Sequence, residues 1–374
     1  MLKPDKRQQE LLFRWMGSYR YTFNKTVDYK ERQYLEEGKS GGYMQKRKEW
    51  KARLLSDAPW ITQIPAHIIY GAMMDADKAY RHSVKKRAQG QKCSLPRCRK
   101  RLQKSFFLLG NSISENGFYT NFIGRMRTAE ALPHKPADSR VIYEGGRWYL
   151  RYSYDCQTQQ LENQGRVCSL DPGVRTFLTL FSPGLIAKVQ DGGFSRIVLL
   201  ANHLDQLISK TSKIKGARRK ARHGLAIARA RTRIRNLVDD LHYQSIGWLF
   251  RNFDTVIFPE GDFTGACRKA RRKIRSKSVR SLLTWSFARF RDRLKHKAVL
   301  YGKQVVIVSE AFTSKTANWC GQQVNNLGGR KTITAQGITM DRDVNGALGI
   351  FLVSLLAQPL VSSECNATNC LNRR

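Results

Sequence analysis

Five acidic residues lie where apolar segments of this 374-residue chain begin or end. They are Asp171 in SLDPGVRTF, Glu260 at the end of DTVIFPE, Glu310 near the end of QVVIVSEAF, and Asp341 and Asp343 at the start of DRDVNGALGI. Acids at the ends of different buried strands lie at the rim of a sheet and can converge there. Carboxylate oxygens are the ligands that Mg²⁺ prefers, and two such ions about 4 Å apart support phosphoryl transfer. The pattern therefore indicates a two-metal site, with helix capping or surface ion pairing as the alternative for Asp343 and Glu260.

The charge balance of the chain indicates a polyanionic partner. There are 67 Lys and Arg residues against 29 Asp and Glu residues, a formal net charge of +38 with a pI of about 10.3. A folded chain with this charge repels itself unless a polyanion neutralises it, and nucleic-acid phosphates do so while releasing counterions. A membrane-surface binder would instead need a single basic, amphipathic helix face. We therefore expect nucleic acid as the partner and no membrane.

Three long segments carry many of the basic residues and contain no acid. They span residues 78–114, 206–238 and 263–291. Their separation along the chain suits a long groove that holds a duplex. Within them we expect nucleic-acid contacts from Lys85, Lys86, Arg87, Arg218, Arg219, Lys220, Arg222, Arg271, Arg272, Lys273 and Arg275.

Hydrophobic periodicity divides the chain into three regions. Residues 1–103 show helical spacing, residues 104–165 alternate with a period of two, and residues 166–374 mix buried strands with long helices. The middle region predicts a small β domain that resembles a barrel. The last region predicts strands over 167–183, 254–260 and 303–312, two long basic helices over 194–252, one helix over 279–302 and a final helix from Asp343. The predicted fold class is therefore multidomain α+β with an α/β domain in the C-terminal half.

The cysteine pattern, the opening sequence and the longest apolar run indicate where in the cell the protein is found. Eight cysteines at irregular spacings do not match a disulfide framework. The opening MLKPDKRQQELL lacks the apolar core of a signal peptide, and the longest apolar run, residues 347–357, is too short to cross a bilayer. We therefore expect an intracellular protein with reduced thiols. In a eukaryotic host, clusters such as CRKARRKIRSK would direct it to the nucleus.

Four segments in this order resemble motifs of the TnpB/Fanzor family of transposon-associated, RNA-guided RuvC nucleases. SLDPGVRTF resembles the first RuvC motif, and SKSVRSLLTWSFARFRDRLKHKAVLYG resembles the helix after the second motif. VSEAFTSKT followed by WCG resembles the start of the zinc lobe, and DRDVNGA resembles the third RuvC motif. The opening QQELLFRWMGSYRYTFNKTV is similar to the N-terminal helix of the family, with Arg20 and the Phe23-Asn24 pair in place. The motif sequences are most similar to those of Fanzor-like members.

The resemblance implies an architecture and an activity. It implies a helical recognition domain at residues 1–103, a wedge-like β-barrel domain at 104–165 and an RNase H-like RuvC domain at 166–374. The implied activity is RNA-guided cleavage of DNA beside a short flanking motif, with base pairing to a guide RNA supplying the specificity. The implied partners are a guide RNA and target double-stranded DNA, with Arg20 among the residues that bind nucleic acid. The implied cofactors are two Mg²⁺ ions.

The resemblance also assigns the acidic residues. By motif, Asp171 is the first catalytic carboxylate and Asp343, in D-x-N, is the last, while Asp341 precedes it. The glutamate stays open between Glu260, at the end of the middle strand as in TnpB proteins, and Glu310, before T-S-K-T as in Fanzor proteins. The alignment at FPEGDF is ambiguous, so Glu310 is preferred and Glu260 comes second. Asp171, Asp343 and either glutamate are the expected Mg²⁺ ligands.

Two departures from the family pattern are visible. The zinc lobe expected at residues 313–340 has Ala317 and Cys320 where the first cysteine pair belongs, and no cysteine follows until residue 365. One thiolate cannot form a structural zinc site, so we expect no zinc and a degenerate lobe that is held by packing or partly disordered. The strand that precedes the K-P pair in the family also looks absent or very short, which would leave an unpaired edge in the β domain.

Three other functions are compatible with parts of the sequence. A cleavage-deficient, RNA-guided DNA-binding protein or transposon accessory would be recognised by the lack of metal-dependent cutting. A transposase-like strand transferase would have to join the ends of its own element. A plain RNA-binding protein would explain the charge but not the ordered carboxylates.

Overall fold

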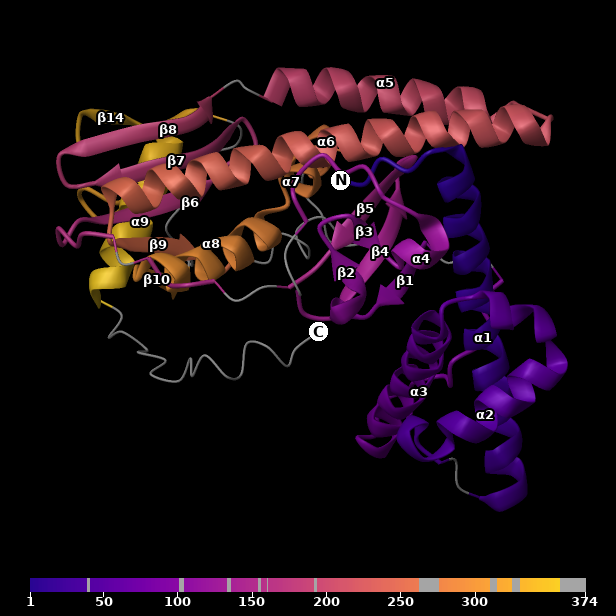
Figure 1. The fold of residues 1–374 in the computed structure, drawn as a ribbon. Helices are drawn as coiled ribbons and strands as arrows, with labels where there is room; N and C mark the ends of the chain where they lie inside the picture. Colours follow the sequence, from indigo (N-terminus) through magenta and orange to yellow (C-terminus); the bar gives the residue numbers. More distant parts are fainter. Residues whose placement is uncertain are drawn as a thin grey trace. The chain divides into compact units, whose positions relative to one another are not determined.

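The computed structural model describes residues 1–38, 41–100, 104–132, 136–153, 156–159, 161–191, 194–261, 276–309, 315–324 and 330–356. The chain forms two compact units, residues 1–155 and 156–374, whose helices and strands are labelled in Figure 1. Among the helices that the structure describes, none is both long enough and apolar enough to cross a membrane.

The first unit begins with helices and continues into short strands. Its described elements are α1 (Lys6–Glu37), α2 (Tyr43–Asp57), η1 (Pro59–Gln63), α3 (Ala66–Ala88), β1 (Ser105–Leu108), η2 (Gly110–Ser112), β2 (Ile113–Ser114), β3 (Gly117–Phe118), α4 (Thr120–Ile123), β4 (Ser139–Glu144) and β5 (Arg147–Arg151). Leu12, Trp15 and Tyr19 recur at helical spacing along α1 and are almost completely buried. They share one core with Phe106 of β1 and Val141 of β4, so the helices and the small sheet bury a common apolar surface.

A partly buried carboxylate joins the helices of this unit to its sheet. Asp75 of α3 accepts hydrogen bonds from Arg140 of β4, at 2.6 Å to each oxygen, and from the hydroxyl of Tyr19 of α1 at 2.8 Å. Burial and the neighbouring Asp75 charge raise the pKa of Tyr19 far above its usual value. Three elements that are distant in sequence therefore meet at one satisfied polar cluster.

The barrel predicted for the middle region is wrong for the residues that the structure describes. Strands β1, β4 and β5 form an open antiparallel sheet, and β2 and β3 form a separate hairpin. A barrel closes only when enough tilted strands meet edge to edge, and these strands are too few and too short. The edge beside β5 is nevertheless occupied, because Leu2 donates its N–H to Trp148 O at 2.9 Å and also bridges to Thr128. The first residues thus supply a very short strand-like pairing at the edge predicted to be unpaired.

The second unit is built on a five-stranded mixed sheet. Its described elements are β6 (Val167–Pro172), β7 (Thr176–Ser182), β8 (Leu185–Asp191), α5 (Phe194–Ser212), α6 (Ala217–Asn252), β9 (Thr255–Pro259), α7 (Ser276–Trp285), α8 (Phe287–Tyr301), β10 (Gln304–Val308), β11 (Thr316–Ala317), β12 (Gln322–Gln323), β13 (Thr332–Ala335), β14 (Ile338–Asp341) and α9 (Arg342–Leu356). The strand order is β10-β9-β6-β7-β8. The pairs β10–β9 and β9–β6 are parallel, whereas β6–β7 and β7–β8 are antiparallel.

Helices cover the two faces of this sheet. Alternate residues of a strand point to opposite faces. Cys168 and Leu170 of β6 lie in the core with α6 and α8, whereas Ser169 faces α9 and its hydroxyl donates to Ala347 O at 2.7 Å. In Figure 1, α6 lies alongside α5, and α9, in yellow, packs against the sheet. Asp171, two residues beyond Ser169, is therefore on the α9 face.

The helix predicted over residues 279–302 is interrupted. The structure divides it into α7 and α8 at Ser286, whose φ of 53° lies in the left-handed region that non-glycine residues rarely adopt. Nothing in the apolar pattern marks this break. Contacts made by Trp285, described below, fix the backbone on its N-terminal side.

Candidate active site

Asp171 lies at the end of β6, directly against helix α9. A Cβ atom added to Gly346 of α9 would come within 2.6 Å of Asp171 Oδ2 and 3.2 Å of its Cγ. A real Cβ atom cannot occupy that position beside the carboxylate as it stands, so the missing side chain makes room for Asp171. The position after DRDVN is therefore a glycine for a steric reason that involves the first candidate catalytic acid.

The two aspartates of DRD have different surroundings. Asp341 ends β14 and caps α9, because its Oδ1 accepts the N–H of Asp343 at 2.9 Å and that of Val344 at 3.4 Å. Its other oxygen pairs with Lys188 of β8 at 2.7 Å. Burial acts to raise the pKa of Asp341, but the Lys188 ammonium and the two backbone N–H groups outweigh it and lower the pKa. Asp341 is thus held by structural contacts.

Asp343 instead faces the turn that follows Asp171. Its Oδ2 is 3.9 Å from the position of a Cβ on Gly173, and its side chain keeps 36% of its surface exposed. The two glycines, one beside each acid, bring the end of β6 and the first turn of α9 close together. The structure therefore places Asp171 and Asp343 in one neighbourhood.

Parallel pairing sets the ends of three strands at the same edge of the sheet. β9 lies between β6 and β10, and Pro259 pairs with Val308. Glu260 follows β9, donates its backbone N–H to Val308 O at 2.8 Å, and has an exposed side chain. Glu260 is therefore at the sheet edge that carries Asp171. Glu310 lies outside the described residues, so the choice between the two glutamates stays a prediction.

The donor atoms at this edge suit a hard divalent cation. Asp171 and Asp343 offer only carboxylate oxygens, which Mg²⁺ prefers to nitrogen or sulfur ligands. Within the described part of the chain, no group of three His, Cys, Asp or Glu side chains is assembled. Two carboxylates thus fit a Mg²⁺ site, and a third ligand would have to come from Glu260 or Glu310.

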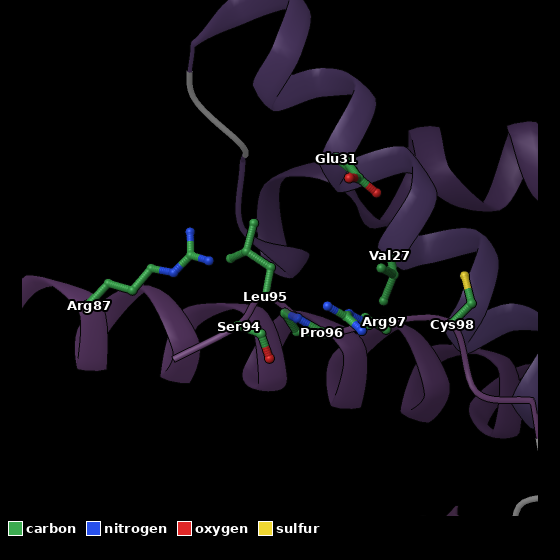
Figure 2. Close-up of a pocket in the computed structure, with 8 residues that line it drawn as sticks. All are labelled: Val27, Glu31, Arg87, Ser94, Leu95, Pro96, Arg97 and Cys98. Atoms are coloured by element: carbon green, nitrogen blue, oxygen red, sulfur yellow. The ribbon is translucent and has the colours of Figure 1, made fainter. Parts of the chain in front are cut away.

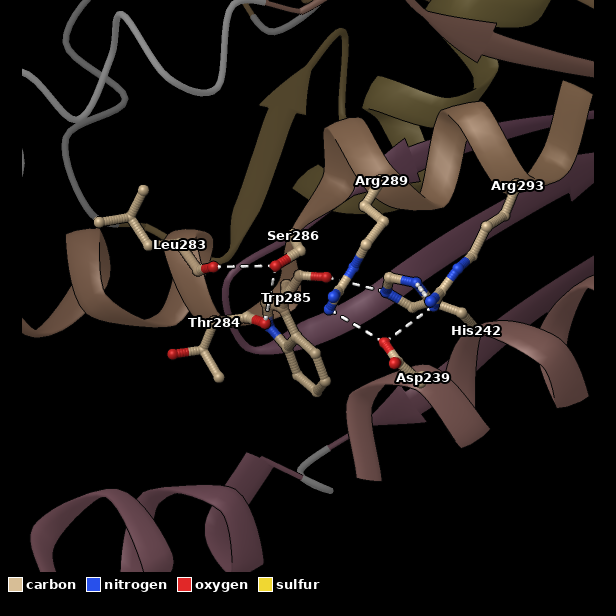
Figure 3. A network of polar contacts seen from close by, with 8 residues as sticks. All are labelled: Asp239, His242, Leu283, Thr284, Trp285, Ser286, Arg289 and Arg293. Carbon is tan, nitrogen blue, oxygen red and sulfur yellow. Dashed lines mark hydrogen bonds and ion pairs between the residues drawn. The ribbon is translucent and has the colours of Figure 1, made fainter. Parts of the chain in front are cut away.

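A polar network that the sequence did not reveal supports the turn after Asp171. Figure 3 shows Trp285, at the end of α7, beside His242 of α6. One ring nitrogen of His242 lies 2.8 Å from Trp285 O, and the indole N–H of Trp285 donates to Val174 O at 3.3 Å. Val174 lies three residues after Asp171. Trp285 therefore links the α7–α8 break to the turn that carries the candidate acid.

His242 is held on both sides. Its Nε2 faces Trp285, its Nδ1 lies 3.1 Å from an Arg293 nitrogen, and its ring stacks on Phe177 at 5.4 Å between centroids. Because Arg293 is a donor, the neutral ring with hydrogen on Nε2 satisfies both contacts. Asp239 pairs with Arg293 at 2.9 Å and with Arg289 at 3.0 Å, which completes the network in Figure 3. A single histidine on a helix carries no sequence signal for this role.

The stability of the second unit should depend on pH through His242. Burial lowers the pKa of His242 to about 4, with the nearby Arg293 charge acting in the same direction. In the unfolded chain His242 takes up a proton as the pH falls through about 6.5, whereas in the folded chain it stays neutral down to about pH 4. Its contribution to the free energy of unfolding should therefore be fully present above pH 6.5 and be lost as the pH falls towards 4. The full difference is about 3 kcal/mol. His242→Gln keeps a donor and an acceptor without titrating. When the free energy of unfolding from urea titrations is plotted against pH, its slope between pH 4 and 6.5 should be smaller for this variant than for the wild type. Equal slopes for the two proteins would contradict this expectation.

The segment that the sequence analysis interpreted as a degenerate zinc lobe packs onto α9 through its described strands β13 and β14. Ala317, which stands where the resemblance would place the first cysteine, is buried with Ile333 and Ala335 of β13. Asn345 of α9 is also buried; its side chain accepts the N–H of Asn318 at 2.8 Å and donates to the carbonyl of residue 316 at 2.8 Å. Apolar packing and an asparagine therefore hold this segment beside the helix that carries Asp343.

The predicted nucleic-acid-binding residues that the structure describes lie on three helices, α1, α3 and α6. Lys85 and Arg87 are exposed and Lys86 is partly buried at the end of α3. Arg218, Arg219, Lys220 and Arg222 are exposed in the first turns of α6. Arg271, Arg272, Lys273 and Arg275 lie outside the described residues. Arg20 donates to Lys100 O at 3.1 Å, so part of its hydrogen-bonding capacity is used within the chain.

The N-terminal half of helix α6 presents a basic face. Arg218, Arg222, Arg229 and Arg233 fall within an arc of about 60° at 100° per residue, and all four are exposed. The four arginines span residues 218–233 of this 36-residue helix, so the basic face is about 23 Å long. Such a face suits contacts with several phosphates along a nucleic-acid backbone.

Comparisons with known proteins agree with this geometry. A family model described as Cas12f1-like, TNB domain matches residues 287–350, which run from α8 into α9. A second model, described as a helix-turn-helix domain of the IS605 OrfB type, matches residues 1–39, where the structure has one continuous helix over residues 6–37. The solved structure of a Cas12f1–sgRNA–target DNA complex is 13% identical with a TM-score of 0.55, covering 91% of this chain and 82% of that chain. The chain therefore shares the fold of that class of protein.

Curated relatives match along most of the chain. A TnpB-like protein of Acanthamoeba polyphaga mimivirus is 24% identical over 94% of this chain and 72% of its own length. The Escherichia coli K12 protein named "Putative RNA-guided DNA endonuclease InsQ" is 23% identical over 93% of this chain and 90% of its own length. The resemblance to TnpB proteins drawn from the motifs is thereby confirmed.

Proposed function

We propose that this chain is an RNA-guided DNA endonuclease that cuts DNA with RuvC-type, carboxylate-bound Mg²⁺. The observation that carries the proposal is the meeting of Asp171 and Asp343 across Gly173 and Gly346, at one end of the mixed sheet. The strand order, with β6 central and only β7 opposed in direction, is what we expect of an RNase H-like domain. The names of the relatives support the same activity.

Under this proposal, different residues would bind the metal ions and position the turn that carries the first acid. Asp171, Asp343 and either Glu310 or Glu260 would hold two Mg²⁺ ions, which when bound supply an activated water and stabilise the leaving oxygen. Lys188 keeps Asp341 engaged elsewhere, so Asp341 would not be a ligand. Neutral His242 and Trp285 would hold the turn that follows Asp171.

The basic surfaces would hold the nucleic acids. The exposed arginines of α6 and the basic end of α3 would contact the phosphates of a guide RNA and of its duplex with target DNA, while base pairing supplies the sequence specificity. Under this proposal, residues 1–103 and 104–165 act in recognition and 166–374 in cleavage. In a eukaryotic host the protein would work in the nucleus.

The test is to purify the chain from cells that carry its native locus, sequence the RNA that co-purifies, and assay cleavage of a matching DNA library with randomised flanks. We expect one structured RNA and Mg²⁺-dependent cutting, with at least about 100-fold loss in Asp171→Asn and Asp343→Asn. Asp341→Asn, which replaces a neighbouring acid of structural role, is the matched control and should retain most activity. Comparing Glu260→Gln with Glu310→Gln then identifies the third ligand.

Each negative result is informative. Guide RNA and DNA binding without cutting under any divalent metal would make the chain a guided DNA-binding protein. No discrete RNA would overturn the guided mechanism. Equal losses in the Asp341 and Asp343 variants would overturn the division of roles within DRD.

A further inference from the structure

An extended segment, residues 93–100 (hereafter the strap), is bound along one face of α1. Asn24 of α1 makes a two-way contact with Arg99 of the strap: Asn24 Oδ1 accepts the Arg99 N–H at 2.7 Å, and Asn24 Nδ2 donates to Arg99 O at 3.2 Å. The Arg99 guanidinium lies 3.4 Å from the ring centroid of Phe23, a cation–π contact. The Phe23-Asn24 pair of the N-terminal helix motif therefore fixes the strap rather than pointing into solvent.

The strap, α1 and the end of α3 enclose a pocket of about 350 Å³. Figure 2 shows Arg87 of α3, Arg97 of the strap and Glu31 of α1 around it. Part of its wall is apolar, formed by Val27, Leu95 and Pro96. Strongly charged groups thus border an apolar surface, in a unit whose partner is expected to be a nucleic acid.

The charged groups of the pocket are available to a ligand. Arg87 uses its Nε to donate to Cys93 O at 2.7 Å, which orients the guanidinium and leaves its terminal nitrogens for other contacts. Within the described residues, no ion pair joins Glu31 to Arg97 or to Arg87. The pocket therefore offers two guanidinium groups and one carboxylate that do not neutralise one another.

We propose that this pocket binds one nucleotide of single-stranded RNA. Guanidinium groups bind phosphates with several N–H donors, so Arg87 and Arg97 suit the two phosphates that flank a nucleotide. The apolar wall suits the flat face of a base, and the Glu31 carboxylate accepts a hydrogen bond from the ribose 2′-hydroxyl, the group that separates RNA from DNA. The inference deepens the proposed function, and rests on it, by naming a surface that receives guide RNA.

The experiment measures RNA binding without cleavage, so it is independent of the nuclease site. The full chain, freed of RNA, is mixed with a labelled single-stranded 10-mer RNA that contains 4-thiouridine, or with the DNA counterpart that contains 4-thiothymidine. Ultraviolet cross-linking with peptide mass spectrometry locates the contact, and fluorescence anisotropy at raised salt measures the affinity. Raised salt suppresses the non-specific contacts of this basic chain.

We expect cross-links on the strap and about fivefold weaker RNA binding in Arg97→Ala. Lys78→Ala, an equal loss of charge at an exposed position of α3, is the control and should change the affinity less than about twofold. Glu31→Gln should abolish the preference for RNA over DNA. Asn24→Ala removes no charge, yet it should weaken RNA binding as Arg97→Ala does and increase hydrogen exchange in the strap.

Two results would overturn the assignment. One is equal binding by the Arg97 and Lys78 variants, with cross-links outside the strap. The other is equal affinity of the wild-type pocket for RNA and DNA. If these occur while guided cleavage persists, the pocket alone is refuted; if no guide RNA is found at all, the proposed function fails independently of them.

Discussion

Gly346→Ala should cost the chain about 100-fold in DNA cleavage while leaving it folded, because the new methyl group occupies space that Asp171 Oδ2 requires. The added Cβ would lie 2.6 Å from that oxygen, and a carboxylate at the end of a short side chain can turn aside. Alanine also favours a helix over glycine by about 1 kcal/mol, which offsets the crowding. The expected result is a stable protein with a displaced first carboxylate.

A glycine in another helix provides the matched control. Gly247 of α6 has nothing within 4 Å of the position that a Cβ would take. Gly247→Ala should therefore leave cleavage unchanged and maintain or slightly raise stability. Thermal unfolding and single-turnover cleavage of both variants separate the two effects. Full activity in Gly346→Ala would mean that Asp171 does not act from the position seen in this structure.

Asp77→Ala should lower the free energy of unfolding by about 3–5 kcal/mol. Asp77 and Lys30 form an ion pair at 2.7 Å, with 1% of each side chain exposed. Lys30 also donates to Gly41 O at 2.9 Å and lies 5.3 Å from the ring centroid of Trp50. Removing the carboxylate leaves an ammonium group buried without its counter-charge.

The double variant Lys30→Met with Asp77→Ala tests this reason. It removes both charges, so it should be more stable than Asp77→Ala alone. Arg53→Ala breaks the exposed pair with Glu49 and serves as the surface control, with little change expected. Urea unfolding gives the free energies, and hydrogen exchange in α1 and α3 assigns the loss to the first unit. A double variant as unstable as Asp77→Ala would show that the buried charge is not the cause.

The sequence anticipated those parts of the site that strand alternation and helix starts determine. The apolar run before Glu260 correctly predicted a buried strand, whereas the structure was needed to show that Ser169, and with it Asp171 two residues later, is on the face that α9 covers. The start of the last helix at DRD was also visible. Local pattern suffices for these features because each follows from the spacing of a few neighbouring residues.

Tertiary contacts determined what the sequence did not show. The helical pattern of residues 279–302 continues through Ser286, and the break there coincides with Trp285 contacts to α6 and to the turn after β6. Strand β8 was not expected, nor was the open form of the small sheet, because neither leaves a local signature. His242 and Gly346 likewise gain their roles only from residues far away in the chain.

The crowding around Gly346 also bears on how copies of such a gene should be judged intact. Mobile elements accumulate substitutions, and a natural test for a live copy is to look for its acidic residues. A copy with alanine at position 346 would keep Asp171 and Asp343 and pass that inspection, yet its first carboxylate would be out of place. A survey that separates active from inactive copies of the gene therefore needs to check the residue at position 346 as well as the acidic residues themselves.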